Sequence, residues 1–334
     1  MRWSTLLVTW GSIACAAPSS SEAPVRSPKS ADAASPRSAP RGPNDAWVTK
    51  LDADHALVGK IWDAKRGAFV TLDALVAELA RTRFVLLGEK HDNPDHHLLQ
   101  ARVIAELVGR GRRPAVVLEM LEAQQRPALE AYVARDDATA AGFGAALGWE
   151  KTSWPPFAEY RPIMEAAFGA RLPLVAGNLA QGEAKSLVKQ GLAALPEARV
   201  KELRLDQALP AALEASLIDE LRASHCGHLP EKLLAPMALA QRARDASLAL
   251  ALARAGVSDG AVLIAGGGHA RRDRGVPYFL ARESPGASVA SLLFREVRRA
   301  DVDAPRYLED EGPFDYVWFT PRASDEDPCA AFGK

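Results

Sequence analysis

The sequence has no excess of charge of either sign. Its 334 residues include 41 lysines and arginines against 42 aspartates and glutamates, which gives a formal net charge of −1. Proteins that bind nucleic acid through its phosphates need clustered positive charge. We therefore expect no nucleic-acid partner.

Cysteine is scarce, with three in the whole chain. Cys15 falls near the N-terminus, so Cys226 and Cys329 remain as the pair for a disulfide in an oxidising compartment. Spacing alone does not show that they meet. The run His225-Cys226-Gly227-His228 lacks the second ligand pair of a structural zinc site, so a surface or packing role is the favoured interpretation.

Several motifs of nucleotide and hydrolase chemistry are also missing. The chain contains no G-x-S-x-G nucleophile elbow and no phosphate-binding P-loop. The triplet Gly266-Gly267-Gly268 is not the G-x-G-x-x-G fingerprint that dinucleotide binding places after the first strand of a sheet. Its glycines either let the backbone approach a ligand or permit positive φ. Serine-hydrolase, nucleotide-hydrolase and nicotinamide chemistry are therefore unsupported.

The hydrophobic run near the N-terminus is too short to span a bilayer permanently. Arg2 followed by the apolar stretch from Leu6 to Ala14 has the layout of a signal peptide, which we predict over residues 1–15. Ser12-Ile13-Ala14-Cys15 resembles a bacterial lipobox, with Ser12 in place of the usual leucine. We therefore expect an exported protein with a lipidated cysteine.

Residues 16–43 are dominated by alanine, proline and serine, a composition that favours a disordered tether. With a lipid on Cys15, this tether would hold the folded part off a membrane of the cell envelope, with the outer membrane as the expected site. The alternative is a cleaved, soluble periplasmic protein.

Residues 44–334 are predicted to form a single α/β domain. Continuous apolar runs, typical of strands buried on both faces of a parallel sheet, alternate with segments of helical spacing. Strand signals are nearly absent from about residue 181 to 255, which predicts a helical insertion in the middle of the chain. The expected fold is an open, mainly parallel sheet flanked by helices. The expected strands are Phe84–Leu87, Pro114–Glu119, Leu172–Ala176, Ala261–Ala265, Ser288–Phe294 and Phe314–Phe319.

Four of these runs end in polar residues. Glu89 and His91 follow the first run, Glu119 the second, Asn178 the third and His269 the fourth. Because the carboxyl ends of parallel strands share one edge, we expect these side chains to converge. Their atoms suit a divalent metal ion, or a general-base pair beside a metal-bound water. The alternative is a polar rim that binds nothing.

His96 and His97 fall in the first turn of a helix that we expect to begin at Pro94 after an Asn93 cap. Histidines at this position either reach a ligand or are solvated.

The segment from Trp154 to Pro162 is predicted to be a loop that presents aromatic rings beside Tyr160 and Arg161. This mixture suits a flat apolar ligand that bears carboxylates, and a phenolate can bind ferric iron. In the alternative interpretation, Trp154 and Phe157 pack a hydrophobic corner and Tyr160 bonds to backbone.

The run Gly88-Glu89-Lys90-His91-Asp92-Asn93-Pro94-Asp95-His96-His97 resembles the signature of the ChaN-like haem-binding lipoproteins in the haem-uptake and Tiki superfamily. The resemblance covers about residues 58 to 320. The later motifs that agree in order are Leu118-Glu119-Met120, Trp154 with Tyr160-Arg161-Pro162, Leu172–Asn178, His225-Cys226-Gly227, Gln241–Asp245, and Gly268-His269-Ala270 before Gly275-Val276-Pro277.

The resemblance implies an α/β fold and an exported, lipid-anchored protein that binds haem and takes part in haem or iron acquisition. It also implies a homodimer around stacked haems with tyrosine ligation, for which Tyr160 is the candidate phenolate. The residues expected near haem are Tyr160, Arg161, His91, His96, His269 and Asn178.

The wider superfamily implies an alternative, a metal-dependent hydrolase of the peptidase or esterase type. Glu89, His91, Glu119 and His269 would then bind a divalent metal ion and act as catalytic residues. Whether the protein is an enzyme stays open, and a binding protein is the preferred interpretation.

Overall fold

The computed structural model describes residues 47–327 and 329–330. The predicted signal peptide over residues 1–15, the lipidation site Cys15 and the predicted tether over residues 16–43 lie outside the described residues and stay predictions. In the part of the chain that the structure describes, no helix has the length and apolar character needed to cross a membrane.

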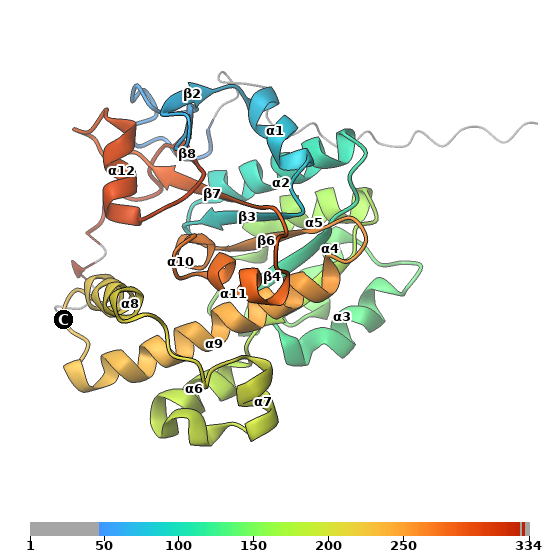
Figure 1. The fold of residues 1–334 in the computed structure, drawn as a ribbon. Helices are drawn as coiled ribbons and strands as arrows, with labels where there is room; N and C mark the ends of the chain where they lie inside the picture. Colours follow the sequence, from blue (N-terminus) through green and yellow to red (C-terminus); the bar gives the residue numbers. More distant parts are fainter. Residues whose placement is uncertain (1–46, 328, 331–334) are drawn as a thin grey trace, which may run out of the picture. The chain divides into compact units, whose positions relative to one another are not determined.

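The sheet at the centre of the fold has eight strands in the order β2-β1-β8-β7-β3-β6-β4-β5 (Figure 1). Neighbouring strands are parallel from β8 through to β5, and the short β1–β2 hairpin adds an antiparallel edge beside β8. The strands are β1 (Ile61–Asp63), β2 (Ala68–Val70), β3 (Phe84–Glu89), β4 (Ala115–Glu122), β5 (Leu174–Asn178), β6 (Ala261–Gly266), β7 (Val289–Glu296) and β8 (Tyr316–Thr320). The predicted fold class is confirmed.

Side chains of the central strands alternate between two apolar cores, because successive residues of a strand point to opposite faces. Val85 and Leu87 of β3 pack into one core, whereas Phe84 and Leu86 pack into the other. The helices that contribute to the first core are α1 (Leu72–Ala80), α2 (Pro94–Gly109), α3 (Arg126–Val133), α4 (Ala140–Ala146) and α5 (Phe157–Gly169).

The second core is covered mainly by the predicted helical insertion. Its helices are α6 (Gln181–Gln190), α7 (Glu197–Glu202), α8 (Ala211–Ser224) and α9 (Glu231–Ala255), joined on the same face by α11 (Val276–Glu283). The short α10 (Gly267–Ala270) follows β6 directly, and α12 (Ala304–Glu311) packs near β8 through Tyr307. Helices occupy this whole region, which explains why it lacks strand signals.

A disulfide links the helical insertion to the C-terminal segment. Cys226, just beyond α8, is bonded to Cys329, with their Cα atoms 5.6 Å apart and a sequence separation of 103. The pairing that spacing alone did not decide is therefore present in the fold.

The structure corrects the prediction of a loop from Trp154 to Pro162. Helix α5 begins at Phe157 and contains Pro162, so Tyr160 and Arg161 lie on a helix. Trp154 to Pro156 do lie in a loop, but the prediction was wrong from Phe157 on, because burial of one apolar face of α5 overrides the local effect of its proline. The residues that form this buried face are Phe157, Tyr160, Ile163, Met164 and Ala167.

Candidate functional site

Strand β3 delivers a buried carboxylate to the carboxyl edge of the sheet. Glu89 is its last residue, and Oε1 accepts a 2.7 Å hydrogen bond from the Tyr160 hydroxyl and lies 2.8 Å from His91 Nδ1. The other oxygen, Oε2, lies 3.5 Å from His97 Nε2. Burial would raise the pKa of Glu89, but the two neighbouring histidines hold it well below its usual range. Glu89 is therefore an anion at neutral pH.

His91 connects the Glu89 carboxylate to the next strand. Its Nε2 lies 3.9 Å from Glu119 Oε2, and its ring meets the Trp154 ring edge-on with 4.8 Å between centroids. Burial lowers the pKa of His91, but hydrogen bonding to Glu89 and the charge of Glu119 together raise it above its usual value. With 35% of its side chain exposed, His91 is the part of this cluster that solutes can reach.

The second half of the site is a chain of ionisable groups across β4, α10 and α9. His269 Nδ1 lies 2.7 Å from Asp245 Oδ1, and its Nε2 lies 3.2 Å from Glu119 Oε1. All three side chains are buried. Asn178 supports this chain from β5, since its amide donates a 2.9 Å hydrogen bond to the Glu119 backbone carbonyl.

The pKa values of His269, Glu119 and Asp245 are all shifted, but not in the same direction. Burial lowers the pKa of His269, but the charges of Glu119 and Asp245 outweigh burial and raise it to about 10. Burial raises the pKa of Glu119, yet His269 and His91 hold it at about 2. For Asp245, burial is the larger effect and its pKa rises to about 6 despite His269. At neutral pH the ring of His269 is a buried cation.

The backbone of Gly266 passes close to both halves of the site. Its N–H donates a 2.7 Å hydrogen bond to Glu119 Oε2, and a Cβ at this position would lie 2.8 Å from His91 Nε2. Its φ is −57°, so glycine serves here for close approach and not for positive φ.

Tyr160 faces this cluster from α5, but it is fully buried. Burial, reinforced by the charge of Glu89, raises the pKa of its hydroxyl, which opposes phenolate formation. Its ring lies against His97 with 3.9 Å between centroids, and neither nitrogen of His97 has a hydrogen-bond partner among the described residues. The hydroxyl bonds to a side chain, so the expectation of a backbone partner was wrong. A ligand cannot reach Tyr160 in this conformation.

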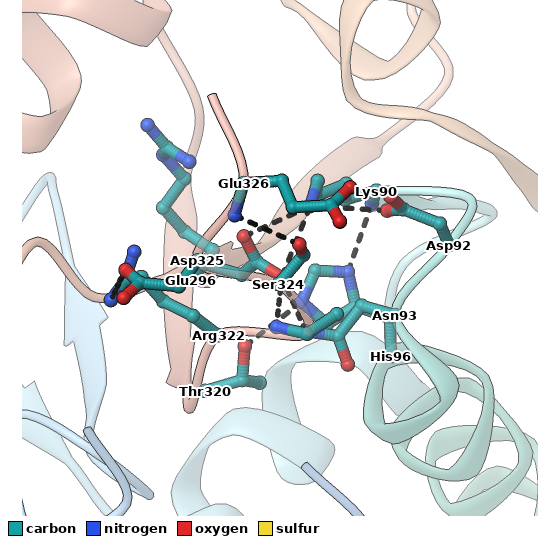
Figure 2. Close-up of polar contacts among 12 residues, drawn as sticks. Lys90, Asp92, Asn93, His96, Glu296, Thr320, Arg322, Ser324, Asp325 and Glu326 are labelled. Atoms are coloured by element: carbon teal, nitrogen blue, oxygen red, sulfur yellow. Dashed lines mark hydrogen bonds and ion pairs between the residues drawn. The ribbon is translucent and has the colours of Figure 1, made fainter. Parts of the chain in front are cut away.

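His96 belongs to a separate polar network (Figure 2). Its Nδ1 accepts a 2.9 Å hydrogen bond from the Lys90 backbone N–H, and its Nε2 lies 2.9 Å from Thr320 Oγ1. The ring is fully buried, and burial holds its pKa well below the usual value. Glu296 anchors the same network by accepting a 2.9 Å hydrogen bond from the Asn93 amide. His96 is therefore neutral, and both of its ring nitrogens make hydrogen bonds within the folded protein.

The contacts thus bring together Glu89, His91, Glu119 and His269 as the parallel sheet led us to expect. They meet as ion-paired couples, and no group of three or more histidine, cysteine, aspartate or glutamate side chains in the described residues is arranged to hold a metal ion. The prediction of a divalent metal ion is unsupported. Arg161 lies apart from the cluster, in an exposed ion pair with Glu165.

A groove of about 590 Å³ lies between α6, α8 and α9. Its walls are built from residues that repeat at helical spacing on each of the three helices. Those used below are Lys185 and Lys189 on α6, Leu217, Leu221 and His225 on or just after α8, and Met237, Gln241 and Arg244 on α9. Gln241 connects the groove to the sheet edge, because its Nε2 lies 3.3 Å from a ring nitrogen of His269.

Sequence reasoning missed this groove. It treated His225 as a surface or packing residue, and it assigned no role to the helical insertion. A usable signal was present in the four-residue spacing of Met237 and Gln241 and of Lys185 and Lys189, which places each pair on one helix face.

A family assignment follows from the sequence match over the same domain. Residues 75–280 match the family model described as haem-binding uptake, Tiki superfamily, ChaN. This span is more than half of the 334-residue chain. The chain belongs to this family. The predicted ChaN resemblance is confirmed.

One solved structure agrees with the ChaN assignment at the level of the fold. The structure that describes cofacial haem binding to ChaN of Campylobacter jejuni has a TM-score of 0.60 and 20% sequence identity, and covers 77% of this chain and 95% of that chain. A mutant of the erythromycin esterase EreC in its open conformation has a TM-score of 0.40 and 14% identity, covering 77% and 95%. No curated protein matches the chain in sequence.

Proposed function

We propose that this protein is an exported haem-binding protein that handles haem or iron at the cell envelope. Membership of the ChaN family supports haem as the ligand class. The observation that carries the proposal for this chain is the groove between α6, α8 and α9, where space, apolar surface and positive charge coincide.

The residues of the groove fit a flat, apolar ligand with two carboxylates. Its volume of about 590 Å³ falls within the roughly 300–1,000 Å³ of small-molecule sites. Leu217 and Leu221 supply apolar wall, and Lys185, Lys189 and Arg244 supply cations for propionate groups. Haem, when bound, supplies the iron chemistry, while these side chains bind and orient the macrocycle.

The groove is a better haem site than the buried side of the sheet edge. Tyr160 and His96 are fully buried and engaged with Glu89 and Thr320, so neither meets a ligand without repacking the core. His269 stands nearer to the groove, because Gln241 contacts its ring from the groove wall.

A hemin titration followed by the Soret band tests the proposal. We expect saturable binding, and we expect the double variant Lys185→Glu and Lys189→Glu to weaken it roughly five- to tenfold through loss of propionate pairing. Lys232→Glu, an exposed change on α9 outside the groove lining, is the matched control and should leave the affinity unchanged. Absence of saturation in the unsubstituted chain contradicts haem binding.

We further propose that Cys15 carries the lipid anchor and that the protein forms a homodimer around haem. The leader and the small residues before Cys15 support the anchor. Replacing Cys15 with serine should move the protein from the membrane fraction to the soluble one. Size-exclusion chromatography with and without hemin tests the dimer, which should form or strengthen when hemin is added.

A second candidate function is hydrolysis of the peptidase or esterase type at the sheet edge. The observation that favours it is the chain Asp245–His269–Glu119, since a histidine held between carboxylates is a common acid–base arrangement. Ester and peptide libraries, offered with and without added divalent metal, test it. Turnover that disappears in a His269→Gln chain that circular dichroism shows to be folded would support this function, and inertness under all these conditions would refute it.

A further inference from the structure

The groove between α6, α8 and α9 contains one acidic side chain. Glu220 of α8 is the one carboxylate among the described residues that line it, and it shares the lining with the cations Lys185, Lys189 and Arg244. None of these three cations forms an ion pair within the part of the chain that the structure describes. A carboxylate repels an anionic ligand, so the presence of Glu220 in a groove suited to anions needs its own explanation.

The carboxylate of Glu220 is directed at two buried arginines. Its Oε2 forms an ion pair with Arg274 and lies 3.4 Å from Arg271 Nη1. Both arginines follow His269 in the turn between α10 and α11, and the Arg274 side chain is only 3% exposed. This turn therefore forms a position for a carboxylate behind the groove wall.

Arg274 depends on Glu220 more than Arg271 does. Arg271 has a bidentate partner, because Asp273 accepts hydrogen bonds from its Nε at 3.1 Å and from its Nη2 at 2.8 Å. Arg274 has Glu220 as its one carboxylate partner among the described residues, and its Nε donates to Ser216 Oγ at 3.3 Å. A buried charge without a partner is strongly unfavourable, so the position on Arg274 has to hold a carboxylate.

The side chain of Glu220 lies between Arg274 and the groove. It is 40% exposed, and it lines the groove while its carboxylate contacts Arg274. Gly268 leaves room for this carboxylate, since a Cβ at that position would lie 3.0 Å from Glu220 Oε1. A ligand carboxylate that enters from the groove therefore reaches Arg274 by taking the place of Glu220. The exchange keeps the buried guanidinium paired and moves the glutamate side chain toward solvent.

We propose that Glu220 is a built-in competitor, whose carboxylate occupies the position on Arg274 that one carboxylate of the bound ligand takes. This inference rests on the proposed haem-binding function, in which the ligand carries two propionates. A propionate replaces the ion pair that Arg274 loses when Glu220 leaves, whereas a neutral ester offers Arg274 no anion. Glu220 therefore makes the groove select the free diacid over an ester of the same macrocycle.

A hemin titration of the full chain and of Glu220→Gln, followed by the Soret band, tests this competition. The amide keeps the size of the side chain but removes its charge, so a propionate meets a weaker competitor at Arg274. We expect the affinity for hemin to rise roughly three- to tenfold and the affinity for hemin dimethyl ester to stay the same. Unchanged or weaker hemin binding by a folded Glu220→Gln chain overturns the proposal.

Asp219→Asn is the matched control, because it removes one negative charge from the neighbouring position of α8. Asp219 is 73% exposed, pairs with Arg222 and does not line the groove. This variant should keep the hemin affinity within about twofold of the parent. A rise as large as that of Glu220→Gln would show that overall charge is the cause, and direct competition would be wrong.

Glu220→Ala tests the carboxylate position without haem. The substitution leaves Arg274 without its carboxylate and should lower the melting temperature. Sodium acetate should restore part of this loss by filling the vacated position, whereas sodium chloride at the same ionic strength should not. The parent chain should show no difference between the two salts. A folded Glu220→Ala chain that acetate does not stabilise contradicts the proposal, and if this variant does not fold, the Glu220→Gln titration decides.

The two proposals fail in different ways. Absence of saturable hemin binding in the unsubstituted chain refutes the proposed function, while the acetate measurement still tests the carboxylate position on Arg274. Saturable hemin binding that Glu220→Gln does not strengthen leaves haem binding in place and refutes the role of Glu220 as a competitor.

Discussion

The ring of His269 lies between two buried carboxylates, 2.7 Å from Asp245 Oδ1 and 3.2 Å from Glu119 Oε1. Among the residues that the structure describes, neither carboxylate forms an ion pair with an arginine or lysine. The imidazolium is thus what allows two acidic groups to be buried side by side.

Replacing His269 with glutamine should therefore destabilise the fold strongly. The substitution removes the cation but leaves Asp245 and Glu119 buried, and breaking a buried ion pair from one side typically costs about 3–5 kcal/mol. Urea unfolding at neutral pH measures the loss. A free energy of unfolding within about 1 kcal/mol of the parent would show that His269 is neutral in the folded protein.

The same histidine should make stability depend on pH. Its folded pKa is raised to about 10, whereas an unfolded histidine titrates at about 6.5. A raised pKa contributes stability that is fully present below the unfolded value and is lost as pH rises through the folded value. We expect the melting temperature to fall between about pH 6.5 and pH 10, and the fall to be much smaller in His269→Gln.

His96 provides the control for this pH series. Its pKa is held well below the usual value by burial, so it is neutral across the alkaline range. His96→Gln should keep the alkaline fall of the parent protein even if its overall stability is lower. If the melting temperature of this variant did not fall at alkaline pH, His96 and not His269 would be the cause of the fall.

Tyr160→Phe should act on stability and not on haem. The change removes the hydroxyl that donates to Glu89 Oε1 while keeping the buried ring. We expect a loss of about 0.5–1.5 kcal/mol, because Glu89 Oε1 loses one hydrogen bond but keeps its contact with His91, and an unchanged Soret spectrum. Tyr132→Phe, which removes a 2.7 Å hydrogen bond to the Thr139 carbonyl elsewhere, is the matched control. A change in the Soret spectrum confined to Tyr160→Phe would indicate that Tyr160 binds the haem iron.

Reduction of the disulfide should lower stability substantially. Cys226 and Cys329 enclose a loop with a sequence separation of 103 residues, for which the chain-entropy model gives about 4.7 kcal/mol. Thermal unfolding with and without reductant measures this difference, and Cys226→Ser should reproduce it. Cys15→Ser leaves the disulfide intact and should remain sensitive to reductant. Equal melting temperatures with and without reductant would mean that the bond adds nothing to stability.

The central strands were predictable because their residues are apolar on both faces. The expected strands at Phe84, Pro114 and Ala261 match β3, β4 and β6 to within three residues at each end. The short hairpin of β1 and β2 carries no such run, and its pairing with β8 depends on contacts distant in sequence. Local pattern therefore sufficed for the parallel part of the sheet and failed at its antiparallel edge.

Part of the candidate site was likewise predictable from the sequence, and part was not. Convergence of Glu89, Glu119 and His269 follows from parallel strands alone, so sequence reasoning reached it. Sequence reasoning did not find the role of Asp245, because this residue lies within the long helix α9. A carboxylate there looks like any polar residue until β6 and α10 bring His269 beside it. Burial of Tyr160 likewise depends on how α5 packs, which no local pattern shows.

Strand β6 lies between β3 and β4, although more than a hundred residues separate it from either along the chain. Adjacent parallel strands are slow to form when their contacts are this distant in sequence. The first two central strands are therefore synthesised before the partner that joins them, and the middle of the sheet closes only when the last quarter of the chain has been made. Truncations that end before β6 would lack both the joining strand and His269, so no N-terminal fragment that stops short of β6 can assemble the site.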